Sequence, residues 1–139
     1  MKVSHMMHKG AEYAAPDETL QQIAKRMRDY DVGAIPICQG DKTIGIVTDR
    51  DLAIRALADG NDPAKLTARD VMSKNVVYCR DVEEAEDAIR IMEENQIRRL
   101  PVLDEAGRLV GMVCLGDISH ALSQDLTGEV TRAVSAHHN

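Results

Sequence analysis

Apolar residues recur along the chain at two spacings, one typical of helices and one typical of strands. Four of them stand three or four positions apart: Leu20, Ile23, Ala24 and Met27. This spacing predicts a helix with one apolar face that packs on a sheet. Two short runs rich in β-branched residues follow, at 34–38 and 43–48, and Gly40-Asp41 between them favours a hairpin.

The residues that flank these segments predict where the helices begin and end. Asp17 follows Pro16 directly before the first helical stripe, so it is the expected N-cap residue. A second helix is expected over residues 49–60, where Gly60 suits the position just past the last turn. With the apolar-leaning segment that precedes Pro16, the predicted order is strand, helix, strand, strand, helix.

The same order of signals occurs twice, because the second half of the chain repeats the first. A shift of 65 positions aligns five identical pairs: Met7 with Met72, Lys9 with Lys74, Tyr13 with Tyr78, Met27 with Met92 and Pro36 with Pro101. One extra residue near 105–107 changes the shift to 66, which aligns three more: Gly45 with Gly111, Val47 with Val113 and Asp51 with Asp117. Such a repeat indicates two copies of one structural unit.

The second copy is expected to have strands at 75–79, 99–103 and 109–114 and helices at 82–96 and 116–123. Its inward helical residues are Ala85, Ala88, Ile89 and Met92. A copy of about 60 residues buries little apolar surface alone. The predicted fold class is therefore α+β, with two β-α-β-β-α repeats packed sheet to sheet by pseudo-twofold symmetry.

The repeat also predicts how the chain is divided. The expected segments are 1–60 for the first repeat, 61–68 for a connector, 69–124 for the second repeat and 125–139 for a C-terminal helix and tail. The last of these rests on Val130, Ala133 and Val134, which stand at helical spacing.

Charge and hydropathy exclude several classes of protein. The chain has 17 basic and 23 acidic side chains, a net charge of −6, whereas nucleic-acid and anionic-membrane binders usually carry a basic face. No uncharged apolar run approaches the roughly 18 residues of a transmembrane helix, and the first 20 residues lack the apolar core of a signal peptide. A cytoplasmic protein without nucleic-acid or membrane partners is expected.

The cysteines and histidines give no clear metal or disulfide signal. Cys38, Cys79 and Cys114 are odd in number and lack CxxC spacing, so reduced, buried thiols are expected. Four histidines lie near the two ends of the chain and leave a metal site open as an alternative: His5, His8, His137 and His138. Because nothing fixes their geometry, no metal site is predicted.

The duplicated motifs resemble the tandem cystathionine-β-synthase (CBS) domain pair. They are DVM at 70–72 with HMM at 5–7, IRRLPVLDEAGRLVGMV at 97–113 with VGAIPICQGDKTIGIV at 32–47, and TDRD at 48–51 with CLGD at 114–117. The chain is also similar to small stand-alone bacterial CBS-pair proteins, some of which belong to stress or hypoxic responses. The resemblance implies a regulatory sensor that binds adenosine compounds in clefts between the repeats and forms a homodimer through its helices.

The stretch GIVTDRD at 45–51 has the residue types that such a ligand needs. Gly45 allows a ligand or a neighbouring strand to approach closely. Thr48 offers a hydroxyl to a phosphate, and Asp51 can accept hydrogen bonds from both hydroxyls of a ribose. The alternative is structural, since Thr-x-x-Asp also approximates a helix capping box.

The resemblance implies the remaining contacts of this first site. Adenine is expected to contact Ile46 and the start of the other repeat at Asn75, Val76 and Val77. A phosphate is expected to meet Arg99, with Arg98 beside it, because the guanidinium forms bidentate hydrogen bonds with phosphate. A solvated pair of surface arginines is the alternative.

The equivalent second cleft departs from this pattern. Its residues are Met112, Cys114 and Asp117, so a thiol replaces the hydroxyl of Thr48. The positions that match Arg98 and Arg99 are Gly33 and Ala34, which carry no charge. One competent site and one weak or empty site are therefore predicted. Retention of the acid without its threonine suggests a role of its own, although a first-turn Asp also favours the helix dipole.

No catalytic machinery is expected. Besides the terminal histidines only His120 is present, and no GxGxxG, P-loop or HExxH motif occurs. The predicted function is a sensor that requires no cofactor and binds AMP, or alternatively NAD(H), ATP or S-adenosylmethionine. It is expected to act through a homodimer or an unidentified protein partner. A ligand-free dimerisation scaffold and a thiol- or zinc-responsive stress protein are the alternatives.

Overall fold

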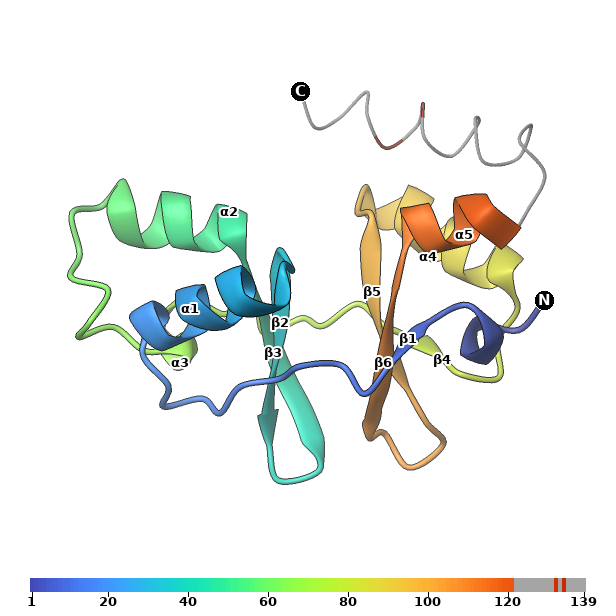
Figure 1. Ribbon diagram of the computed structural model, residues 1–139, viewed down its shortest axis with the longest axis horizontal. Coiled ribbons are helices and arrows are strands. Elements are labelled where there is room, and N and C mark those ends of the chain that lie inside the picture. Colours follow the sequence, from blue (N-terminus) through green and yellow to red (C-terminus); the bar gives the residue numbers. More distant parts are fainter. Residues whose placement is uncertain (122–131, 133, 135–139) are drawn as a thin grey trace. The chain divides into compact units, whose positions relative to one another are not determined.

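The computed structural model describes residues 1–121, 132 and 134, which form an α+β fold, as predicted (Figure 1). The chain packs as two compact units. The first-repeat unit contains residues 12–76, and the second-repeat unit contains residues 1–11 together with the chain from Val77 onward. Each unit thus includes the segment that opens the other sequence repeat. The boundaries predicted from the duplication itself remain a prediction.

The first-repeat unit is built on an antiparallel hairpin. Strands β2 (Ala34–Gln39) and β3 (Lys42–Thr48) pair along their lengths, and Gly40 allows the tight turn with a φ of 61°. This confirms the hairpin that the two β-branched runs predict. Helix α1 (Leu20–Tyr30) buries Leu20, Ile23 and Met27 in the core of this unit. Ala24 was expected on the same stripe, but it lies on the exposed face.

The start of α1 differs from the expectation at Asp17. The N-cap residue is Thr19, whose Oγ1 accepts a hydrogen bond from the Gln22 N–H at 3.2 Å, while Gln22 Oε1 accepts one from the Thr19 N–H at 2.9 Å. This reciprocal capping box satisfies two backbone donors at once. Asp17 lies instead in the turn before the helix, so the prediction of its capping role is wrong.

The second helical segment is not the uniform α-helix predicted over 49–60. One turn of α-helix, α2 (Asp49–Asp51), continues into η2 (Leu52–Leu57), which is wound as a π-helix. Its wider hydrogen bonds join the Ala58 N–H to the Ala53 carbonyl and the Asn61 N–H to the Ala56 carbonyl, both at 3.0 Å. Gly60 follows with a φ of 73°, as the predicted helix end requires.

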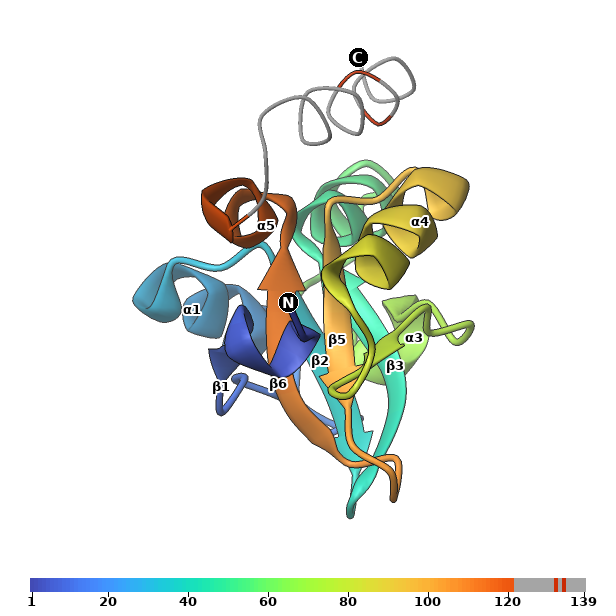
Figure 2. The same ribbon diagram turned by 90° about the vertical axis from the view of Figure 1, so that its right-hand side faces the viewer.

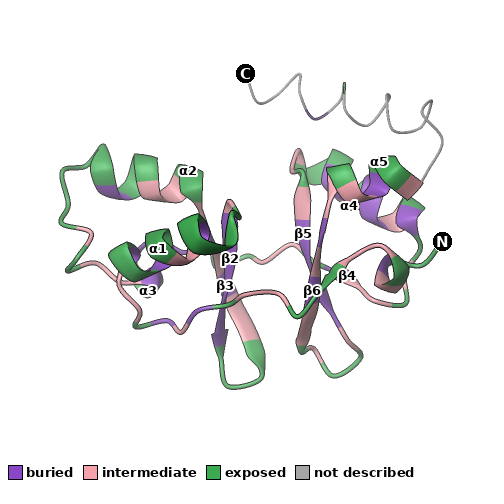
Figure 3. Cartoon of the chain, viewed as in Figure 1, coloured by how far each residue is buried: buried purple, intermediate pink, exposed green. Residues whose placement is uncertain are grey.

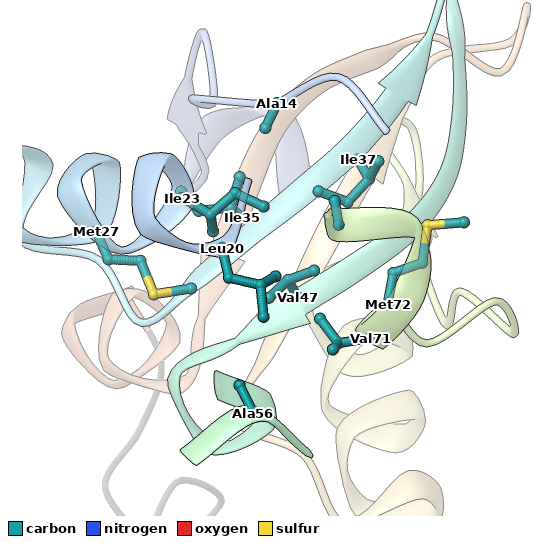
Figure 4. Packing of buried hydrophobic residues seen from close by; sticks show 11 residues of the cluster. Ala14, Leu20, Ile23, Met27, Ile35, Ile37, Val47, Ala56, Val71 and Met72 are labelled. Carbon is teal, nitrogen blue, oxygen red and sulfur yellow. The ribbon is translucent and has the colours of Figure 1, made fainter. Parts of the chain in front are cut away.

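The predicted connector is packed onto the first-repeat unit. The Leu20 and Gln21 N–H groups at the start of α1 donate to the carbonyls of Leu66 and Pro63, each at 3.0 Å. The short helix α3 (Ala68–Val71) follows and buries Ala68 and Val71. Together these elements close one apolar core (Figure 4), whose buried members are Ala14, Leu20, Ile23, Met27, Ile35, Ile37, Val47, Ala56, Ala68, Val71 and Met72.

The second-repeat unit has a four-stranded sheet in the order β1-β6-β5-β4. Its strands are β1 (His8–Lys9), β4 (Cys79–Arg80), β5 (Arg99–Leu103) and β6 (Leu109–Cys114). Its helical segments are η1 (Val3–His5), α4 (Ala85–Asn95) and α5 (Leu115–Ala121). The segments α4 and β5 pack together, and α5 continues directly from β6 (Figure 2). Strands β5 and β6 lie where the sequence predicts them.

The core of this unit follows the predicted stripe on α4, where all four inward residues are buried (Figure 3). Its buried members are Val3, Cys79, Ala88, Ile89, Met92, Leu100, Val102, Val113, Ile118 and Val134. The strand expected at 75–79 is wrong in position: the paired residues are Cys79 and Arg80, parallel to β5, and residues 75–77 lie outside the strands. Most of the predicted C-terminal helix, including Val130 and Ala133, lies outside the described residues.

Across the described part of the chain, no helix combines the length and the apolar character that a membrane span requires.

Candidate functional site

The glycine of GIVTDRD is needed for a close approach by the chain itself. A Cβ on Gly45 would lie 2.5 Å from the Met72 Sδ and 3.0 Å from the Ser73 carbonyl oxygen. The equivalent Gly111 has the same environment, because a Cβ there would lie 2.7 Å from the Met7 Sδ and 2.6 Å from the His8 carbonyl oxygen. Gly45 was expected to allow the close approach of either a ligand or a neighbouring strand. The structure shows a chain segment in that place, residues Met72 and Ser73.

That neighbouring segment pairs with the strand beside Gly45. The Ile46 N–H donates to the Ser73 carbonyl at 3.1 Å, and the Ser73 N–H donates to the Ile46 carbonyl at 3.0 Å. In the second-repeat unit, His8 pairs with Met112 at the equivalent position. The motifs HMM and DVM thus supply the methionine that covers each glycine, and the next residue joins the strand.

Thr48 and Asp51 form a capping box, as the structural alternative predicts. Thr48 Oγ1 accepts a hydrogen bond from the Asp51 N–H at 3.1 Å, and Asp51 Oδ2 accepts one from the Thr48 N–H at 2.9 Å. The pattern is common in this chain, since the Thr67 N–H donates to Asp70 Oδ2 at 2.8 Å and the Glu84 N–H donates to Asp87 Oδ2 at 2.9 Å. Capping alone therefore accounts for the spacing of these two residues.

The second carboxylate oxygen of Asp51 faces a cation that the sequence analysis did not single out. Arg55 Nε lies 3.8 Å from Asp51 Oδ1, and Arg55 Nη1 donates to the Val71 carbonyl at 3.0 Å. The i, i+4 spacing of Asp51 and Arg55 is a recognisable signal for such a pair. Arg55 links α2 to the end of α3, beside the Met72 that covers Gly45.

The equivalent acid, Asp117, keeps half of the capping box. Its Oδ2 accepts a hydrogen bond from the Cys114 N–H at 2.8 Å, which needs no hydroxyl on residue 114. This contact explains why the acid is retained without a threonine. Its Oδ1 lies 2.9 Å from the His8 Nε2, a partner that no sequence pattern indicated.

The residues predicted to form the first site are divided between the two units. Ile46, Thr48 and Asp51 follow one another at the end of β3, in the same unit as Asn75 and Val76. The other three predicted residues belong to the second-repeat unit: Val77, Arg98 and Arg99. Their contribution to a ligand bound at Asp51 remains a prediction.

Within its own unit, Arg99 is paired with Cys114, the residue whose N–H donates to Asp117. Arg99 on β5 is paired with Cys114 on β6, just as Ala34 is paired with Thr48 in the other unit. The Arg98 carbonyl accepts a hydrogen bond from the Leu115 N–H at 2.7 Å. The cation predicted for the first site therefore lies in the same unit as Cys114 and Asp117.

Burial raises the pKa of all three thiols. It raises the pKa of Cys79 to about 12, with the charge of Glu83 adding to the effect. Burial likewise raises the pKa of Cys114; Asp117 raises it further and Arg99 opposes this. The pKa of Cys38 is raised by burial and lowered by a contact of its Sγ with the Thr43 Oγ1 at 3.6 Å. Thiols of this kind are poor nucleophiles near neutral pH.

Within residues 1–121, with 132 and 134, no three His, Cys, Asp or Glu side chains are grouped so that they could bind one ion. His8 and Asp117 are in contact, but they form a pair.

Comparison with known proteins gives the family and its relatives. The CBS domain matches this chain twice, at residues 3–57 and 68–124. Hypoxic response protein 1 of Mycobacterium tuberculosis is 36% identical over 130 residues, which are 93% of this chain and 90% of that protein. The uncharacterized protein MK0525 of Methanopyrus kandleri is 39% identical over 105 residues, or 75% of this chain. Those residues are 54% of MK0525, so the chain spans about half its length.

Two solved structures are similar in both fold and sequence. The crystal structure of Hypoxic Response Protein I with two coordinated zinc ions has a TM-score of 0.81 and 37% identity, covering 88% of this chain and 100% of that one. The CBS domain pair of protein MJ0100, in complex with 5′-methylthioadenosine and S-adenosyl-L-methionine, has a TM-score of 0.78 and 28% identity, covering 87% and 94%. The two copies of the CBS domain, the strand-to-helix motif in each unit and these relatives lead to one conclusion: the chain belongs to the CBS domain family, as a tandem pair.

Proposed function

We propose that this CBS pair is a regulatory module that binds an adenosine compound, with Thr48 and Asp51 as its main polar contacts. The observation that carries the proposal is the state of Asp51. One of its oxygens is fixed by the Thr48 N–H, whereas the other has a cation at 3.8 Å, beyond hydrogen-bond distance. An ionised carboxylate accepts hydrogen bonds only, so this second oxygen suits the two hydroxyls of a ribose.

Capping and ligand binding are compatible at Thr48. Its hydroxyl accepts the Asp51 N–H and still has a proton to donate, which suits a phosphate oxygen. The side chains of Ile46 and Thr48 are partly exposed, which a direct ligand contact requires. We assign the adenine contacts to Ile46, Asn75, Val76 and Val77 and the phosphate contacts to Arg98 and Arg99, following the family resemblance.

The ligand class is supported by the relatives. MJ0100 has been solved with S-adenosyl-L-methionine and 5′-methylthioadenosine, both adenosine compounds, and is 28% identical to this chain. We propose AMP as the ligand, with NAD(H), ATP and S-adenosylmethionine as the alternatives. A regulatory and not a catalytic role is proposed, because the two CBS domains account for residues 3–57 and 68–124.

Isothermal titration calorimetry with AMP, ATP, NAD and S-adenosylmethionine tests this function. The decisive variant is Asp51→Ala, and Asp70→Ala is its matched control. Both variants remove the acid of a Thr-x-x-Asp capping box in the same unit, so both lose a similar helix cap. We expect at least a tenfold loss of affinity for Asp51→Ala and a change below about twofold for Asp70→Ala. Equal effects of the two substitutions, or no binding of any of the four ligands, would contradict the proposal.

Zinc binding is the second candidate function. It is favoured by the two coordinated zinc ions of Hypoxic Response Protein I, which is 37% identical to this chain. The raised thiol pKa values oppose it, because zinc binds the thiolate. Mass spectrometry of metal in protein purified without chelators tests it. Zinc in a 1:1 ratio to the chain that is lost in Cys38→Ser or Cys114→Ser would favour this candidate.

We further propose that the module acts as a homodimer or on a protein partner. Several large apolar side chains are exposed on the helical segments of the first-repeat unit: Tyr30, Ile54 and Leu57. Leu57 is 69% exposed, which is unfavourable for a leucine in water. Light scattering of the purified protein tests the dimer. A ligand-free scaffold would show the dimer without any binding in the calorimetric panel.

A further inference from the structure

We propose that His8 determines which of the two equivalent acids, Asp51 or Asp117, is available to an adenosine ligand. The inference rests on the proposed function. It adds a residue that determines which of the two acids the ligand can reach. It comes from a difference between the two units at one position. His8 fills this position in the second-repeat unit, and Ser73, 65 positions further along the chain, fills it in the first-repeat unit.

The backbone is the same at both positions. His8 pairs with Met112 in the β1–β6 ladder, and Ser73 pairs with Ile46 beside β3. The residue before each one, Met7 or Met72, covers the equivalent glycine. Each side chain therefore starts from the same place relative to the acid of its own unit.

The two side chains differ in reach. The His8 Nε2 lies 2.9 Å from Asp117 Oδ1, and the acceptor is a carboxylate, so the imidazole nitrogen is the donor. Between Ser73 and Asp51, both of which the structure describes, no hydrogen bond is formed. A serine hydroxyl is a single bond from Cβ, whereas the imidazole extends several bonds further.

The consequence is a difference between the two carboxylates. Asp117 has both oxygens engaged, Oδ2 by the Cys114 N–H and Oδ1 by His8. Asp51 has only Oδ2 engaged by a hydrogen bond, and its Oδ1 faces Arg55 at 3.8 Å. A ribose at Asp117 must displace His8, whereas a ribose at Asp51 meets an oxygen that lacks a close hydrogen bond.

The hydrogen bond between His8 and Asp117 can break without a change in the backbone. The His8 side chain is 74% exposed, while its backbone is fixed in the sheet. Only the imidazole side chain has to move for this hydrogen bond to break, and a hydrogen bond of this kind makes a small net contribution to the free energy of unfolding. His8 therefore weakens ligand binding at Asp117 without blocking it permanently.

A reciprocal exchange of the two residues tests the inference. His8→Ser gives the second-repeat unit the residue of the first, and Ser73→His does the reverse. Wild type and both variants are titrated with AMP and with S-adenosylmethionine by calorimetry, and circular dichroism confirms that each is folded. We expect one site in the wild type, two sites in His8→Ser, and at least a tenfold weaker first site in Ser73→His. His8→Ala is a second variant that frees Asp117 Oδ1, because it removes the imidazole without adding a hydroxyl.

The outcomes separate this inference from the proposed function. A wild type that binds with one site, together with His8→Ser and His8→Ala variants that keep one site and the same affinity, overturns the inference alone. Two equal sites in the wild type also overturn it and leave the proposed function standing. No binding of either probe by wild type and variants overturns both. A second site that appears in both His8 variants supports the inference, whatever the result for Ser73→His.

Discussion

Met72 packs directly on Gly45, so that a Cβ on residue 45 would lie 2.5 Å from the methionine Sδ. The two residues belong to different copies of the sequence repeat, yet they lie in one packing unit. Met7 and Gly111 show the same relationship in the other unit. The glycine of the strand and the methionine of the opening motif are thus one structural feature, present twice.

Gly45→Ala is therefore expected to destabilise the protein. The methionine side chain can shift, but the Ser73 carbonyl at 3.0 Å is backbone that pairs with Ile46. Overpacking of this kind costs about 1–3 kcal/mol of unfolding free energy. Urea unfolding followed by circular dichroism measures it.

Gly116→Ala is the matched control for that substitution. A Cβ on Gly116 would meet no atom within 4 Å, and the residue lies in α5. Alanine favours a helix over glycine, so stability should stay unchanged or rise by up to about 1 kcal/mol. If Gly45→Ala and Gly116→Ala unfold at the same urea concentration, the close approach of Met72 to residue 45 does not exclude a Cβ there.

Cys114→Thr is expected to stabilise the second-repeat unit. Asp117 already accepts from the Cys114 N–H, so a threonine hydroxyl at 114 would complete the capping box found at Thr48 and Asp51. A good N-cap side chain contributes about 0.5–2 kcal/mol. Thermal unfolding measures the gain. Cys79→Thr is the contrasting variant, because it places a hydroxyl at a fully buried core position and should lower stability.

The raised pKa of Cys79 predicts a pH dependence of stability. The unfolded thiol loses its proton near pH 9.0, whereas the folded thiol keeps it up to about pH 12. The folded state therefore binds more protons in this window, and stability falls as pH rises from 9 towards 12. Comparison of wild type with Cys79→Ala in urea at pH 8, 9 and 10 isolates this contribution. A stability difference between the two proteins that is constant over these pH values would refute it.

The same burial predicts how the thiols react. At pH 8, buried Cys79 should be labelled by iodoacetamide only when the protein unfolds. Cys114 is partly exposed and should be labelled faster than Cys79 in the folded protein. Peptide mass spectrometry of timed samples gives both rates. Rapid labelling of Cys79 in the folded protein would contradict its position in the core.

Much of the fold could be predicted from hydrophobic spacing, because burial depends on one face of each element. The stripe Ala85, Ala88, Ile89 and Met92 is buried as predicted, and strands β5 and β6 have the predicted bounds. The errors concern local hydrogen bonds. Thr19 and not Asp17 caps α1, since Gln22 completes the box from three residues on. The π-helical winding of η2 has no signal in the apolar pattern.

Contacts of the candidate site between residues close in sequence could be predicted. Contacts between segments far apart in sequence could not. Thr48 and Asp51 form the capping box that their spacing predicts, and this was one of two interpretations of the motif. The contact between His8 and Asp117 joins residues 109 positions apart, and only the packing of β1 on β6 brings them together. Sequence spacing contains no information about such a pair.

The exposed apolar side chains on η2 predict the behaviour of the proposed dimer. Leu57→Glu should shift the protein towards the monomer, because it places a charge where the dimer would bury a leucine, and a buried unpaired charge is costly. Val82→Glu is the control, since Val82 is similarly exposed, at 64%, but belongs to the second-repeat unit and not to η2. Size-exclusion chromatography with light scattering over a range of protein concentrations measures both. A dimer that is lost equally in the two variants, or that persists in Leu57→Glu, would place the interface elsewhere on the molecule.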